Sequence, residues 1–176
     1  MKGILAALLL LASMHAMAQK AYTVTRDTED TGFIYNGLIT FNDLDNEATF
    51  DWLRIGNHGY SPDDETITYL SSSLDRYTMV VFMGTWCDDS HNLVPKLEKV
   101  LQMTKYPMGQ LTMYGVDRAK VTIRGENTKY NITFVPTIIL FRNGTEVGRI
   151  TESVKKSVEE DLAAIIAKDM GMPAPH

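Results

Sequence analysis

A short apolar run that leads directly into a cysteine and then into a helical pattern is the feature that most restricts how this chain can fold. Residues 79–83 are apolar without interruption, which is typical of a strand buried on both faces of a sheet. Cys87 follows four residues later. Apolar residues then recur at helical spacing, at Leu93, Val94, Leu97, Val100 and Leu101. The sequence therefore predicts a buried strand, a cysteine at the turn, and an amphipathic helix directly after it.

Downstream of this helix, the hydrophobic patterns predict an alternation of strands and helices. We expect three strands and one helical turn, at residues 111–116, 137–141 and 147–150 and at residues 126–130. Asn143 and Gly144 predict a tight hairpin turn between the last two strands. Apolar residues at helical spacing predict a closing helix: Val154, Val158, Leu162 and Ile165. The predicted order from residue 77 is strand, helix, strand, helix, strand, strand, helix.

Residues 19–75 precede this unit as an N-terminal extension with a pattern of its own. Strand-like runs at residues 21–25 and 34–41 are separated by an acidic turn, and two short helices are expected to follow. The second helix has the clearer start, because Ser61 can cap it. We expect the extension to pack on the domain formed by residues 76–170.

Both ends of the chain are predicted to lie outside the folded unit. Lys2, the apolar run at residues 4–12 and the small residues that follow it predict a cleaved signal peptide covering residues 1–18. This signal peptide would direct the protein to the periplasm or outside the cell, and cleavage before Gln19 would release the mature form. The apolar run is too short to span a membrane, which disfavours the alternative of a retained signal anchor. After cleavage, we expect the mature chain to have no membrane span. Residues 171–176, with one glycine and two prolines, predict a flexible tail.

Length and charge exclude some broad classes of protein. A length of 176 residues suits one domain with decoration rather than two domains. The formal net charge is −5, so the sequence predicts no basic surface of the kind that binds nucleic acid.

The chain contains a single cysteine, Cys87, and so cannot form a disulfide within itself. Cys87 is therefore either an inert core residue or a free thiol that reacts with another molecule. Its position at a helix start favours the reactive alternative, because unpaired N–H groups and the helix dipole stabilise a thiolate. Asp88 and Asp89 act in the opposite direction, since neighbouring carboxylates disfavour negative charge on the sulfur. His91, or a hydrogen bond from the Ser90 hydroxyl, could offset them.

Two separated motifs resemble those of the thioredoxin superfamily. Residues 86–90, Trp-Cys-Asp-Asp-Ser, resemble the active-site motif Trp-Cys-x-x-Cys, and residues 129–144 resemble the segment with a cis-proline and the hairpin after it. Residues 84–87 and 115–118 further resemble a group of exported thioredoxin-like proteins common in Bacteroidota. The resemblance implies an α/β thioredoxin fold, a central mixed sheet flanked by helices, which here carries an N-terminal extension.

The resemblance also implies roles for individual residues. Pro136 would be cis and would face Cys87, and the backbone of Val135 would pair with an extended substrate segment. Trp86 would form an apolar lip. The partners implied are thiols and disulfides of proteins or of glutathione, and no cofactor is implied.

Two departures from the family pattern affect the same chemical step. Ser90 replaces the second cysteine of the motif, so the internal disulfide of a dithiol thioredoxin cannot form. Val81 stands six residues before Cys87, where thioredoxins keep a buried aspartate that helps to deprotonate the second thiol. The sequence thus favours a protein that retains the first nucleophilic attack and lacks the internal resolving step.

Three functional hypotheses follow. In the first, Cys87 acts as a monothiol redox group that forms mixed disulfides, as in disulfide isomerisation or deglutathionylation. In the second, the groove at Pro136 holds partner polypeptides, and Cys87 turns over slowly or not at all. In the third, Cys87, His91 and Asp88 share a metal ion. The lack of a second cysteine disfavours the third, so we expect no metal.

Overall fold

The computed structural model describes residues 21–173. The predicted signal peptide, residues 1–18, and the last three residues of the predicted tail lie outside the described residues. Within them, six strands form one sheet in the order β1-β2-β4-β3-β5-β6. The strands are β1 Tyr22–Arg26, β2 Phe33–Ile39, β3 Thr78–Met83, β4 Leu111–Gly115, β5 Thr137–Arg142 and β6 Thr145–Thr151.

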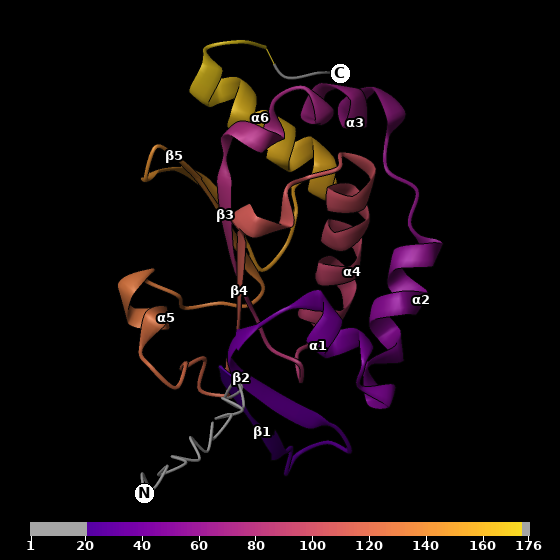
Figure 1. Ribbon diagram of the computed structural model, residues 1–176, viewed down its shortest axis with the longest axis vertical. Coiled ribbons are helices and arrows are strands. Elements are labelled where there is room, and N and C mark those ends of the chain that lie inside the picture. Colours follow the sequence, from indigo (N-terminus) through magenta and orange to yellow (C-terminus); the bar gives the residue numbers. More distant parts are fainter. Residues whose placement is uncertain (1–20, 174–176) are drawn as a thin grey trace, which may run out of the picture.

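Six α-helices and three short 3-10 helices connect and cover the strands (Figure 1). The α-helices are α1 Phe41–Asp45, α2 Asp51–Gly59, α3 Asp64–Ser71, α4 Asp88–Met103, α5 Glu126–Lys129 and α6 Val158–Met170. The 3-10 helices are η1 Ala48–Phe50, η2 Leu74–Arg76 and η3 Met108–Gln110. From β3 onward, the α-helices and strands follow the predicted order. No helix within residues 21–173 combines the length and the apolar character needed to cross a membrane.

Strand β3 lies in the middle of the sheet, which explains why its sequence is apolar without interruption. It pairs in parallel with β4 and antiparallel with β5, so the sheet is mixed. Side chains of Met79, Val81 and Met83 enter the larger hydrophobic core, whereas Val80 and Phe82 enter a smaller core on the opposite face. Both faces of the strand are therefore shielded from water, which explains why every residue of this run is apolar.

The helices form a thick layer on one face of the sheet and a thin layer on the other. Helix α4 contacts α2, α3 and α6 on the side of the larger core, and α5 with its flanking loops covers the other face (Figure 1). On that second face the ring of Phe82 stacks on Tyr114, with ring centroids 5.0 Å apart. The mixed sheet flanked by helices that the sequence predicted is thus confirmed.

The N-terminal extension continues the sheet. Strand β2 pairs antiparallel with β4, and β1 pairs antiparallel with β2, so the hairpin of these two strands covers the edge that β4 would otherwise expose. Helix α2 packs against α4. The extension therefore contributes both strands and helices to the domain.

Two details of the extension differ from the sequence prediction. The second predicted strand ends before Phe41, because Thr40 caps α1: its hydroxyl accepts from Asp43 N–H at 3.2 Å, and the Asp43 carboxylate accepts from Thr40 N–H at 2.9 Å. The extension consequently has three α-helices rather than two. Helix α3 is capped by Asp63 and not by Ser61, since the Asp63 carboxylate accepts the Thr66 N–H at 2.7 Å.

Candidate active site

Cys87 lies between the end of β3 and the first turn of α4. Residues 84–86 form the turn between them, and Cys87 N–H donates to the carbonyl of Gly84 at 3.1 Å. Cys87 itself is the N-cap of α4, with extended backbone angles, and its side chain makes no capping hydrogen bond. The thiol is partly exposed and stands at the positive end of a helix of 16 residues. Cys87 is thus neither fully buried nor fully exposed.

The thiol faces the loop that precedes β5. The Sγ–H group of Cys87 donates to the carbonyl of Val135 at 3.4 Å. The peptide bond between Val135 and Pro136 is cis, and the side chains of both residues are buried. The structure therefore brings together three of the residues that the sequence analysis selected, Cys87, Val135 and Pro136.

Ser90 lies beneath the turn and is fully buried, whereas the cysteine is not. Its hydroxyl oxygen accepts the Gly84 N–H at 3.2 Å, which ties the first turn of α4 to the end of β3. Val81 is also fully buried. This position in β3 therefore carries an apolar side chain of the larger core and not a carboxylate.

The titratable residues that follow Cys87 are exposed or contact groups other than the thiol. Asp88 and Asp89 are exposed. His91 Nε2 is 2.8 Å from the carbonyl of Thr85, so this nitrogen donates its proton to that carbonyl. The imidazole stacks on Trp52, with ring centroids 4.3 Å apart, and its Nδ1 lies 4.0 Å from Asp88. His91 thus holds the turn in place from the helix side.

The hypothesis of a metal site at Cys87, His91 and Asp88 gains no support from this arrangement. A carbonyl already occupies His91 Nε2, and the Asp88 side chain is fully exposed. Among residues 21–173, no group of three or more His, Cys, Asp or Glu side chains is arranged to hold a metal ion.

Trp86 borders the cysteine and is held on three sides. Its indole N–H donates to the carbonyl of Val116 at 3.0 Å, and the Arg118 guanidinium lies over the ring at 5.3 Å from the centroid. The third side is Gly84, where a β-carbon would stand only 2.7 Å from the indole ring. A larger residue at position 84 would therefore displace the indole ring.

Thr85 connects the turn to the N-terminal hairpin, a role that the sequence analysis missed. Its hydroxyl donates to the carbonyl of Phe33 at 2.7 Å and accepts the Tyr35 N–H at 3.2 Å. Both bonds meet at the same hydroxyl oxygen. The side chain is 5% exposed, so these bonds are shielded from water. These two bonds join strand β2 to Thr85, in the turn that leads to Cys87.

Arg118 and Asp27 were not selected as site residues either, although residues 115–118 belong to a motif used for the resemblance. Arg118 binds Asp27 through two hydrogen bonds, Nε to Oδ1 at 2.9 Å and Nη2 to Oδ2 at 2.8 Å. These bonds lower the pKa of Asp27 below its ordinary value, and they outweigh the opposing effect of burial. The two residues are 91 positions apart, and no local pattern in the sequence indicates their pairing.

Comparison with known proteins gives consistent matches around this site. A model of the thioredoxin family matches residues 65–168. Thioredoxin-1 of Saccharomyces cerevisiae is 27% identical over 90 residues, which are 51% of this chain and 82% of that protein. Thioredoxin of Echinococcus granulosus is 27% identical over 90 residues, which are 51% of this chain and 78% of that protein. The solved structure of Fasciola hepatica thioredoxin has 22% identity and a TM-score of 0.38, and the match covers 57% of this chain and 88% of that one.

The segment matched by the family model contains Cys87, Ser90 and Pro136. It begins only at residue 65, so the hairpin of β1 and β2 lies outside it. The contacts that Thr85 and Arg118 make with this hairpin therefore join the matched segment to a part of the chain beyond it.

Proposed function

The chain belongs to the thioredoxin family, and on that premise we propose that it exchanges thiols and disulfides through one cysteine, Cys87. Family membership supports a thiol–disulfide redox function in general terms. One observation supports the narrower proposal: a partly exposed Cys87 thiol starts helix α4 and lies 3.4 Å from the carbonyl of Val135, beside a cis-proline. A thiol and a backbone carbonyl of the loop before β5 thus lie side by side.

The proposed reaction has two exchange steps. Disulfide rearrangement within a substrate needs no external oxidant or reductant, whereas deglutathionylation uses glutathione as the reductant and produces glutathione disulfide. The Cys87 thiolate attacks one sulfur of a substrate disulfide, a new S–S bond forms, and the other substrate sulfur leaves as a thiolate that takes a proton from water. A second thiolate, from the substrate or from glutathione, then attacks the substrate sulfur of the mixed disulfide. This step releases Cys87 as the thiolate, so the protein ends in the state in which it began. The net result is a rearranged disulfide or a deglutathionylated thiol.

The monothiol character of the proposal depends on Ser90. A hydroxyl cannot form a disulfide, and the chain has no other cysteine. The Ser90 oxygen is buried and accepts the Gly84 N–H, so it supports the turn structurally. Release of the mixed disulfide therefore falls to an external thiol or to a thiol of the substrate.

The test is capture of the mixed disulfide. Wild-type protein is incubated with a peptide that carries one glutathionylated cysteine, and intact mass is measured after acid quenching. We expect an adduct on Cys87 and free glutathione or free peptide in equal amount, and no adduct in Cys87→Ser. An unmodified wild-type protein that still binds the peptide, measured by calorimetry, would instead support the second hypothesis, a binding module without redox turnover.

We further propose that the protein is exported and that its mature form begins near Gln19. The support is the sequence pattern of residues 1–18. Mass measurement of the protein recovered from the periplasm of a bacterial host tests this, with an expected N-terminus at Gln19. Recovery of the chain with Met1 intact, in the cytoplasm or in the membrane fraction, would contradict it.

A further inference from the structure

We infer that Asp27 and Arg118 act as a pair of positioning residues that hold Trp86 in place beside Cys87. The N-terminal hairpin is then part of the substrate site. The inference rests on the proposed function, because it concerns how disulfide substrates are oriented at Cys87. It assigns a role to the loop between β1 and β2, which lies outside the segment matched by the family model.

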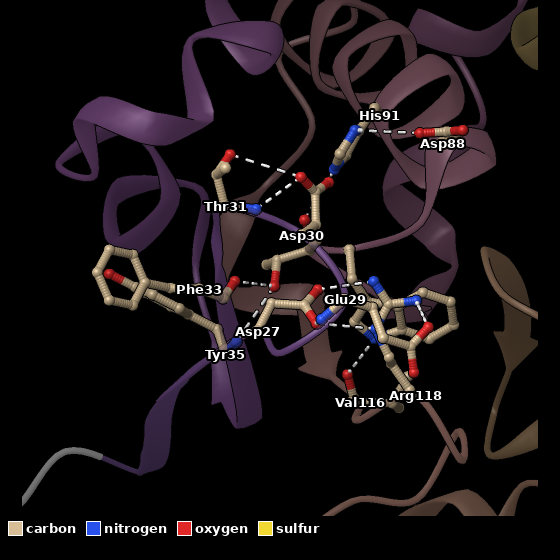
Figure 2. Close-up of polar contacts among 12 residues, drawn as sticks. Asp27, Glu29, Asp30, Thr31, Phe33, Tyr35, Asp88, His91, Val116 and Arg118 are labelled. Atoms are coloured by element: carbon tan, nitrogen blue, oxygen red, sulfur yellow. Dashed lines mark hydrogen bonds and ion pairs between the residues drawn. The ribbon is translucent and has the colours of Figure 1, made fainter.

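The pair itself has the geometry of a fixed contact. Asp27 receives two parallel hydrogen bonds from Arg118, and it also accepts the Glu29 N–H at 3.1 Å (Figure 2). The exposed fraction of the Asp27 side chain is only 2%, against 30% for Arg118. A carboxylate buried to this degree requires a charged partner, and a bidentate guanidinium fixes the orientation of that partner.

A second acidic residue of the same loop adds charge without the same constraint. Glu29 lies 3.0 Å from Arg118 Nη1, and 67% of its side chain is exposed. An exposed pair of this kind is screened by water and holds its partner loosely. The geometry therefore assigns the positioning role to Asp27 rather than to Glu29.

The guanidinium transmits this fixed position to Trp86. Arg118 lies over the indole ring, Gly84 lies against it, and the Val116 carbonyl binds its N–H group. Without Asp27, the guanidinium would be free to leave the ring, and the indole would lose its contact with Arg118. Since Trp86 directly precedes Cys87, movement of the indole changes the surface that a substrate meets as it approaches the sulfur.

This arrangement predicts a selective effect on large substrates. A peptide disulfide must fit against the indole while its sulfur aligns with Cys87 Sγ, and loss of alignment slows such reactions strongly. Iodoacetamide is small enough to reach the sulfur without that contact. The Asp27–Arg118 pair should therefore matter for the peptide disulfide and not for the small reagent.

The experiment compares Asp27→Asn with Asp30→Asn in the full chain. Asp30 lies in the same loop and hydrogen-bonds to Thr31 instead, so it controls for the loss of one carboxylate at this place. Two rates are measured at neutral pH, under conditions in which each variant is fully folded as judged by its urea unfolding curve. The first is the rate of mixed-disulfide formation with the glutathionylated peptide, and the second is the rate of alkylation by iodoacetamide. We expect Asp27→Asn to lower the first rate by about fivefold to tenfold and to leave the second within about twofold. The Asp30→Asn protein should match the wild type in both.

A second measurement follows Trp86 directly. The chain has two tryptophans, so Trp52→Phe provides a background in which fluorescence reports on Trp86 alone. In that background, Asp27→Asn should raise the acrylamide quenching constant by about twofold, and Arg118→Gln should do the same. The double variant Asp27→Asn with Arg118→Gln should be no worse than the more affected single variant, because both remove one contact.

The outcomes separate the inference from the proposed function. A wild-type thiol that forms no adduct with the peptide would overturn the proposed function. A reactive wild type with an equally reactive Asp27→Asn variant and unchanged quenching of Trp86 would overturn the inference alone. Equal loss of both rates in Asp27→Asn, or additive effects in the double variant, would also overturn it, because they indicate general loosening of the fold. Should Asp27→Asn fail to fold, Arg118→Gln provides the same comparison.

Discussion

Ser90 is the residue at which this chain differs most clearly from a dithiol thioredoxin. It occupies the position three residues after Cys87, and its buried hydroxyl accepts the Gly84 N–H. Residues three apart on a helix lie on the same side, with β-carbons about 5–6 Å apart. The β-carbons of a disulfide lie about 3.5–4.5 Å apart, so a disulfide between these positions requires a small local adjustment at the start of α4.

We predict that Ser90→Cys forms an internal disulfide with Cys87 under mild oxidation. The measurement is the free-thiol count before and after oxidation, together with the mass loss of two hydrogens. Reductase activity on a model disulfide should appear but stay modest, because Val81 provides no buried carboxylate to deprotonate the second thiol. Persistence of two free thiols would show that the start of α4 does not have the geometry of a dithiol site.

The matched control for this prediction is Ser90→Ala. It removes the acceptor for the Gly84 N–H and leaves a buried donor without a partner. We expect the free energy of unfolding to fall by about 1–3 kcal/mol, with no internal disulfide under any condition.

At the scale of elements, the contact between β2 and the turn before α4 depends on one hydroxyl. Thr85 donates to the Phe33 carbonyl and accepts the Tyr35 N–H. We predict that Thr85→Val, which keeps the shape of the side chain, lowers the free energy of unfolding by about 1–3 kcal/mol because it leaves two buried backbone groups unpaired. Urea unfolding gives the stability, and hydrogen exchange of the Tyr35 amide gives the local effect.

Thr85→Ser is the conservative partner of that variant. It retains the hydroxyl and loses only a methyl group, so the Tyr35 amide should stay protected from exchange. If Thr85→Val left the protection of Tyr35 unchanged, the hydroxyl would not be what holds β2 to the turn.

The packing of α2 on α4 depends on a glycine in α2. A β-carbon at Gly56 would stand 2.8 Å from Cβ of Pro95, a ring atom inside α4 that cannot rotate away. We predict that Gly56→Ala lowers the free energy of unfolding by about 1–3 kcal/mol through overpacking, which outweighs the gain in helix propensity of about 1 kcal/mol. Thermal or urea unfolding measures this change.

Gly59 in the same helix provides the control. A β-carbon there would meet no atom within 4 Å. Gly59→Ala should be neutral or stabilising by up to about 1 kcal/mol. Equal effects of the two substitutions would contradict close packing at Gly56.

At the scale of the whole molecule, the extension and the thioredoxin-like part share one hydrophobic core. The larger core contains Tyr35 and Leu53 from the extension together with Val81, Leu97 and Ile166. The sheet is also continuous, since β2 pairs directly with β4. The two parts therefore share the larger core, whereas the smaller core on the opposite face is formed by the thioredoxin-like part alone.

We predict that residues 21–173 unfold in one cooperative transition. Far-UV circular dichroism, which reports on all elements, and tryptophan fluorescence should give the same urea midpoint. Trp52 lies in the extension and Trp86 in the thioredoxin-like part, so each can be followed alone after replacement of the other by Phe. Separate midpoints for the two tryptophans would show that the extension unfolds as an independent unit.

The sequence by itself determined the order of strands and helices after residue 77 and the position of Cys87 between a strand and a helix. Both follow from local patterns, because a strand buried on two faces must be apolar at every residue and an amphipathic helix must repeat its apolar face. The monothiol hypothesis also follows from the sequence, because a chain with one cysteine cannot form an internal disulfide. Helix starts were predicted less well: Asp63 rather than Ser61 caps α3, since several residues near a helix start can accept an N–H group.

Only the tertiary structure decided how the extension meets the site. The pairing of Thr85 with β2, and of Arg118 with Asp27, joins residues 50 or more positions apart. Local propensity carries no information about such contacts, because they depend on which strand pairs with the edge of β4 and on how the hairpin loop then lies. The acidic turn that the sequence predicts between the first two strands contains the buried carboxylate Asp27, which binds the Arg118 guanidinium that lies over Trp86. Burial and charge pairing between distant residues are properties of the folded chain, since they arise only when the hairpin lies against the turn that carries Cys87.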